Sequence, residues 1–224
     1  MVSIPGSDLL SGALHVVSQS LLIPVMVTLL IFLVYAVIEV GGILSEYSSR
    51  IKLDAAQVEL IVKGITVATT SSDICRVVEN TELPREHKDV LIKIANNIEM
   101  APKARETLAR KLIEDEELKA EKRVEKTDII GKVGPAIGLM GTLIPLGPGL
   151  SAMGSGDITT LSKHLIIAFD AAVIGMATAS IGYTISKIRR RWYDDQLSTL
   201  DALAESILEV LEDVKAETKT VVFQ

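Results

Sequence analysis

The chain has 224 residues, of which 48% are hydrophobic and only 4% are aromatic, and it carries a formal net charge of −6. An acidic chain gives no general case for nucleic-acid binding. Its single cysteine, Cys75, cannot form an internal disulfide, and three scattered histidines make no metal-site spacing with it, so we expect neither a metal nor another cofactor.

Charged residues are distributed unevenly along the chain. Residues 9–38 and 133–156 contain no Lys, Arg, Asp or Glu, and residues 164–186 contain a single acid, Asp170. Because about 20 apolar residues cross a bilayer core, this pattern predicts three transmembrane helices, at residues 19–43, 132–152 and 160–186. The first apolar run is too long for a cleaved signal peptide, and no basic segment precedes it.

Lys and Arg residues predict the orientation of these spans. Residues 1–44 contain none, residues 45–131 contain fifteen, and "KIRRR" follows the third span. Because positively charged segments stay in the cytoplasm, we predict a plasma-membrane protein with residues 1–18 and the 153–159 turn outside. Residues 44–131 and 187–224 are then cytoplasmic. Arg189–Arg191 would serve as a stop-transfer anchor or as a contact for anionic lipid.

The cytoplasmic segments are predicted to be helical. Asp54, followed by Gln57, fits a capping box, and Pro84 suits the first turn of a helix. A charged, solvated helix starting near Pro102 meets no breaker before Gly131, so it is expected to run on into the second span. The third span likewise continues into residues 187–224. The predicted fold class is an all-α membrane protein with three transmembrane helices and long cytoplasmic helical extensions.

The second span, "GPAIGLMGTLIPLGPGL", combines an apolar composition with many glycines and prolines. Helices in lipid associate through close packing, which small residues permit. Each of the last two spans presents one face of small residues. These are Gly134, Gly138, Gly141 and Pro145 on the second span, and Ala168, Ala172, Gly175, Ala179, Gly182 and Ser186 on the third. A short turn joins the spans, so they are predicted to be antiparallel neighbours, with Pro145 and Pro148 bending the second.

Two polar residues of this hairpin are candidates for an ion pathway. If the hairpin is centred near residues 156 and 157, Thr142 lies level with Ala171, one residue from Asp170. A carboxylate within a membrane helix marks an ion path by default. Alternatively, Asp170 is protonated and forms a hydrogen bond between helices.

The segments "GPAIGLMGTLIPL" (134–146) and "HLIIAFDAAVIGMATASIGYTISKIRRRWYD" (164–194) resemble the pore helices of the MotA/TolQ/ExbB proton channel family. The "TLIPLGP" and "SGDI" details are most similar to versions from methanogenic archaea. The resemblance implies a homo-oligomer, commonly a pentamer, whose second and third helices line a pore. It also implies a single-span partner of the ExbD/TolR/MotB type, with an intramembrane aspartate, which ion flow turns or shifts.

By this resemblance, Thr142 matches the family's pore threonine and Pro135 the proline at the helix entrance. Many relatives have a second hydroxyl where this chain has Ala172, and Asp170 stands two residues earlier, so Asp170 would face a neighbouring helix. Two alternative functions also fit the sequence: a channel or transporter without such a partner, and a membrane scaffold for protein assembly. An enzyme is not expected, because the sequence has no phosphate-binding loop or nucleophile–base arrangement.

Overall fold

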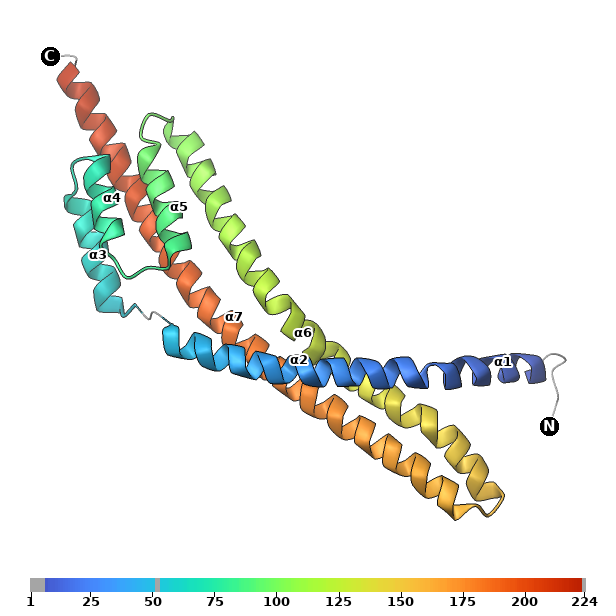
Figure 1. Ribbon diagram of the computed structural model, residues 1–224. Coiled ribbons are helices and arrows are strands. Elements are labelled where there is room, and N and C mark those ends of the chain that lie inside the picture. The colour runs from blue at the N-terminus through green and yellow to red at the C-terminus, as the bar shows by residue number, and fades with distance from the viewer. Residues whose placement is uncertain (1–6, 51–52, 223–224) are drawn as a thin grey trace. The chain divides into compact units, whose positions relative to one another are not determined.

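The computed structural model describes residues 7–50 and 53–222, which are almost entirely helical and contain no strand (Figure 1). The all-α prediction is therefore confirmed for these residues. Residues 1–6 of the predicted N-terminal segment, residues 51–52 and the last two residues of the predicted C-terminal helix lie outside the described residues. The helices are α1 (Ser7–Ser20), α2 (Leu22–Ser49), α3 (Ala55–Val67), α4 (Ser71–Glu79), α5 (Arg85–Asn96), α6 (Pro102–Gly154) and α7 (Ile158–Val222).

Within the described residues, three helical stretches are long and apolar enough to cross a membrane: Leu9–Ser48, Pro102–Gly154 and Ile158–Val214. Each contains one of the predicted spans and extends beyond it. The charged helix that begins at Pro102 does run on through the second apolar segment, as predicted, and the third apolar segment does continue into the C-terminal helix.

The first stretch is divided between α1 and α2 at Leu21. Pro24 has no N–H to donate to the carbonyl of Ser20, four residues earlier. The Ser20 hydroxyl turns back onto its own helix and donates to the Val16 and Val17 carbonyls, each at 2.9 Å. Backbone hydrogen bonding then resumes, because the Val25 N–H donates to the Leu21 carbonyl at 3.0 Å.

The chain divides into two compact units, and both α6 and α7 contribute to each. Of the described residues, unit 1 contains 7–46 and 124–188, and unit 2 contains 47–50, 53–123 and 189–222. In unit 1, α6 and α7 run antiparallel and are joined by a short turn (Figure 1). Gly156 in that turn has a φ of 81°, which favours glycine. Asp157 caps α7 by accepting a hydrogen bond from the Thr160 N–H at 3.0 Å.

In unit 2, α3, α4 and α5 pack with the remaining parts of α6 and α7 around one apolar core. The predicted capping box at Asp54 and Gln57 is present at the start of α3. Pro84 is the N-cap of α5, one residue before the helix begins. The fully buried core side chains are contributed mainly by α4, α5 and α7, and include Ile74, Val78, Leu91, Ile94, Leu200, Leu203, Ile207 and Leu211.

The sequence predicts that the charged part of α6 is solvated. In the structure, two of its charged residues are buried. Arg105 is 0% exposed and Glu116 is 7% exposed. Glu116 is paired with Lys119 at 2.6 Å, whereas the guanidinium nitrogens of Arg105 find no hydrogen-bond partner among the described residues. The interior of unit 2 therefore includes two charged side chains, Arg105 and Glu116, that the charged sequence of α6 predicts to be at the surface.

Candidate functional site

The backbones of α6 and α7 touch where Gly138 faces Gly175. A β-carbon added to Gly138 would lie 3.0 Å from the Gly175 Cα atom, and one added to Gly175 would lie 2.6 Å from the Gly138 Cα atom. Real β-carbons essentially never approach a backbone atom so closely as the second distance. Glycine at both positions therefore allows this close approach of the two helices.

The contact continues on both sides of that crossing. A β-carbon on Gly134 would lie 3.0 Å from the Ala179 Cβ atom, and one on Gly141 would lie 2.7 Å from the Ala171 Cβ atom. Gly141 also faces Leu29 of α2, whose side chain packs with Val25, Ile144 and Ala171. The pairings of Gly134 with Ala179 and of Gly138 with Gly175 are the register expected from the hairpin, and this register places Thr142 level with Ala171.

The small-residue faces identified in the sequence lie largely at this contact. On α6, the four predicted residues Gly134, Gly138, Gly141 and Pro145 are all buried. On α7, five of the six are buried, and Ala172 is only half-buried. Ala171 and Thr178, which were not predicted, are 1% and 0% exposed. The buried face of α7 is thus rotated slightly from the predicted one.

Thr142 lies half-buried on α6, and its hydroxyl donates to the Leu139 carbonyl at 2.7 Å. This is a bond to its own helix, three residues back. A hydroxyl has two acceptor lone pairs besides its single donor, so Thr142 retains the capacity to accept a hydrogen bond from another group. Pro135, the other residue matched on this helix, is exposed.

Asp170 lies on the exposed side of α7, facing away from the α6–α7 contact. Its neighbours on that side are apolar, since Phe169 is 67% exposed and Val173 is 63% exposed. The Asp170 carboxylate forms no hydrogen bond or ion pair with any other described residue, and Thr142 does not reach it. The structure therefore places the two candidate residues at a similar depth without bringing their side chains together.

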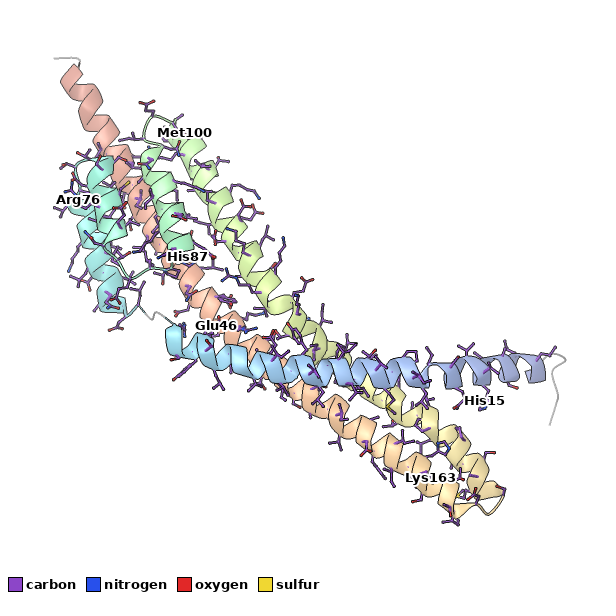
Figure 2. All side chains as sticks on the ribbon, in the orientation of Figure 1. His15, Glu46, Arg76, His87, Met100 and Lys163 are labelled. Carbon is purple, nitrogen blue, oxygen red and sulfur yellow. The ribbon has the colours of Figure 1, made fainter. Side chains whose placement is uncertain are left out.

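Asp170 belongs to a line of exposed residues that recurs every two turns of α7. The line consists of Lys163, Asp170, Ala177 and Thr184, which are seven residues apart and all exposed. Residues seven apart share one helical face. Lys163 lies near the α6–α7 turn (Figure 2). One side of α7 thus carries three polar side chains within an otherwise apolar stretch.

Gln19 is a site residue that sequence reasoning missed. Pro148 has no N–H to donate to the Ile144 carbonyl, and the Gln19 side-chain amide of α1 donates to that carbonyl at 3.2 Å. The sequence signal that could have identified Gln19 was its polar amide within the charge-free segment 9–38. Its acceptor could not be identified from sequence, because 125 residues separate the two groups.

A second missed group joins α6 and α7 on the side of the contact away from the turn. Asp128 pairs with Lys132 at 2.6 Å and accepts a hydrogen bond from the Ser186 hydroxyl at 3.3 Å. The neighbouring Thr127 is 1% exposed, and its hydroxyl donates to the Val124 carbonyl at 2.8 Å. These residues form a polar contact between the two helices where the glycine-rich contact ends.

The sequence model of the MotA/TolQ/ExbB proton channel family matches residues 85–202, slightly more than half of the chain. The match begins with α5 and ends within α7. It therefore includes the α6–α7 contact, Thr142 and Asp170. No curated protein matches the chain.

Proposed function

Because the chain belongs to the MotA/TolQ/ExbB proton channel family, we propose that it is the channel subunit of an ion-driven membrane motor. In this proposal, protons flow down the membrane gradient past α6 and α7 of a homo-oligomer, commonly a pentamer in this family. The flow moves a single-span partner of the ExbD/TolR/MotB type. The family is one of channels and not of enzymes, and the chain has apolar helices suited to a membrane.

The outward position of Asp170 is the observation that carries this proposal. A charged carboxylate at the centre of a membrane helix costs about 2.5–3.5 kcal/mol even on the lowest scales. Asp170 has no partner among the described residues of its own chain, and apolar side chains flank it. We infer that a second copy, the partner or a water-filled pore covers it, because lipid cannot satisfy it.

Thr142 is proposed to line the ion path at the depth where the partner's aspartate exchanges its proton. A threonine hydroxyl donates and accepts at once, so it can relay a proton or hold a protonated carboxyl. Its hydroxyl already donates within α6, and its oxygen can still accept a hydrogen bond from a protonated carboxyl. The packing residues Gly138, Gly141, Gly175 and Ala179 would keep the helices at a fixed separation around this path.

The proposed topology follows from the positions of Lys and Arg. The N-terminus and the 153–159 turn face outside, and residues 44–131 and 187–224, which include unit 2, face the cytoplasm. Residues 45–131 contain fifteen Lys and Arg, and residues 1–44 contain none. This asymmetry is the pattern that orients membrane proteins.

Replacing Thr142 with valine tests the ion path, since valine has nearly the same shape without the hydroxyl. In vesicles containing the chain and its partner, Thr142→Val should lower gradient-driven proton flux by about a hundredfold, the scale of a lost proton-transfer group. Its oligomer, measured by native mass spectrometry, should be unchanged. Thr28→Val is the matched control, because the Thr28 hydroxyl also bonds within its own helix, to the Pro24 carbonyl at 2.8 Å, but lies on α2.

Asp170→Asn in the same vesicles separates the two roles considered for this acid. If Asp170 relays protons, Asp170→Asn should lose flux while the oligomer stays largely intact. If Asp170 forms a structural hydrogen bond, asparagine can still form one and flux should be retained. Full flux in Thr142→Val would contradict the proposed path whatever Asp170 does. Flux of wild type in vesicles without the partner would instead indicate a partner-independent channel.

A further inference from the structure

A groove of about 860 Å³ lies between α6 and α7 in unit 2, and only these two helices line it. Its floor is apolar. Ala109 and Ala204 are buried there, and Ile113 and Leu208 are partly buried. None of the helices α3, α4 and α5 contributes a lining residue. The groove is therefore an uncovered apolar strip on the two helices that continue into the proposed pore.

The walls of this groove are strongly acidic. Among the lining residues that the structure describes, seven carry carboxylates, namely Glu106, Glu114, Glu117, Asp201, Glu205, Glu209 and Glu212, and Arg110 carries a positive charge. Glu106 pairs with Arg110 at 3.1 Å, and Glu114 pairs with Lys111 at 3.2 Å. The other five form no ion pair with a residue that the structure describes.

On α7 the acids follow the helical repeat. Asp201, Glu205 and Glu209 are spaced four residues apart and are exposed along one face. Like charges at this spacing destabilise a helix by about 0.2–0.5 kcal/mol per pair. Arg110 in the groove and the buried Arg105, which interacts with Glu212, balance only part of the seven carboxylates, so further compensating charge is expected from outside the chain.

We propose that the groove binds a basic, amphipathic helical segment of the single-span partner, at the cytoplasmic end of that partner's span. This inference rests on the proposed function, which supplies the partner and the cytoplasmic location of unit 2. Residues immediately cytoplasmic of a span are typically rich in Lys and Arg. Leucine-like side chains at helical spacing would occupy the floor, as in other helix-in-groove complexes, and the basic side chains would reach the acidic walls.

The size and charge of the groove favour this occupant over others. From Pro102 to Glu117 the α6 wall extends about 22 Å, at 1.5 Å per residue, which suits about four turns of helix. Nucleic acid and anionic lipid would be repelled by the carboxylates. A second copy presenting the same groove across a twofold axis would place acid against acid, which costs binding energy.

Peptide binding to the full chain in detergent tests this site without any ion gradient. The probe is a fluorescein-labelled peptide of about 15 residues, built from leucine and lysine at helical spacing, and its binding is followed by fluorescence anisotropy. The groove variant Asp201→Asn/Glu205→Gln/Glu209→Gln should bind it about tenfold more weakly, the effect of losing three exposed ion pairs. The control variant Glu59→Gln/Glu79→Gln/Glu82→Gln removes the same charge from exposed positions outside the groove and should bind like wild type.

Two further measurements test the apolar floor of the groove and the identity of its occupant. A peptide with serine in place of leucine should bind more weakly to wild type, because the floor is apolar. Equal binding by the groove and control variants, with unchanged melting temperatures, would overturn the proposal. So would a disulfide between copies of a Cys75→Ser/Glu205→Cys variant, since it would show that a second copy covers the groove. Because no gradient is used, either failure leaves the flux test of Thr142 unaffected.

Discussion

Gln19 shows at the scale of one residue how a polar side chain is accommodated in an apolar segment. Its amide replaces the N–H that Pro148 cannot supply to the Ile144 carbonyl. Gln19→Leu should therefore leave that carbonyl unsatisfied and lower the free energy of unfolding by about 1 kcal/mol. Thermal unfolding in detergent would measure this loss.

Pro148→Ala is the matched partner for a double-mutant cycle with Gln19. Alanine restores an N–H four residues after Ile144, so the amide of Gln19 is no longer needed. The destabilisation by Gln19→Leu should shrink in the Pro148→Ala background. An equal loss in both backgrounds would mean that Gln19 acts through something other than this carbonyl.

His87 lies on α5 (Figure 2). It is 7% exposed, and its Nδ1 atom has no hydrogen-bond partner among the described residues. Burial lowers the pKa of His87 below its usual value, and the nearby Arg123 lowers it further, while Glu116 and Glu86 oppose the shift. The folded chain thus binds a proton at His87 less readily than the unfolded chain. The stability contributed by neutral His87 is fully present above pH ~6.5 and is lost as the pH falls through the lower, folded pKa.

His87→Gln should therefore flatten the decline of melting temperature between about pH 6.5 and about pH 5.5, the range below an ordinary histidine pKa. The change His15→Gln, at an exposed position of α1, is the control and should leave the decline as in wild type. If both variants decline as wild type does, the loss of stability in acid comes from other groups than His87.

At the scale of the element, the α6–α7 contact depends on the absence of side chains. Gly175→Ala would place a β-carbon 2.6 Å from the Gly138 Cα atom, and a backbone cannot yield as a flexible side chain can. We expect a loss of about 1–3 kcal/mol in stability, the usual cost of overpacking. Thermal unfolding of the oligomer in detergent would detect it.

Gly41→Ala is the control for this contact, because nothing lies within 4 Å of a β-carbon added to Gly41 on α2. Alanine is the better helix former by about 1 kcal/mol, so this variant should be as stable as wild type or more so. A similar loss in both variants would show that the effect comes from something other than the close approach of α6 and α7.

At the scale of the whole molecule, the proposed topology makes Cys75 an internal reporter. It is the only cysteine and is partly exposed on α4. A membrane-impermeant maleimide should label Cys75 only after cells are opened. Burial and the nearby Glu79 raise the pKa of the thiol, so labelling should be done at mildly alkaline pH to provide thiolate.

A cysteine placed in the α6–α7 turn gives the opposite expectation. Ser155 is exposed there, and a Cys75→Ser/Ser155→Cys variant should be labelled in intact cells. Labelling of Cys75 from outside would contradict the topology, and with it the assignment of unit 2 to the cytoplasm on which the peptide-binding groove depends.

Much of the fold could be predicted because its signals are local. The three apolar stretches follow from composition, the α3 cap follows from Asp54 and Gln57, and a short turn makes α6 and α7 antiparallel. That turn also determines their register, which is why Thr142 was expected level with Ala171. The candidate site was predicted less completely, because Gln19 and the Asp128–Lys132–Ser186 group act across helices.

The sequence by itself determined the helical class, the three apolar stretches and the small-residue faces, since each depends on neighbours within one helix or one hairpin. Only the tertiary structure decided which side of each helix is covered. One residue rotates the helix face by about 100°, so a slight change of contact buries Ala171, leaves Ala172 half-buried and turns Asp170 outward. The burial of Arg105 was likewise decided by the tertiary structure. In the sequence it is part of a charged run on α6, but in the folded chain the side chain is buried.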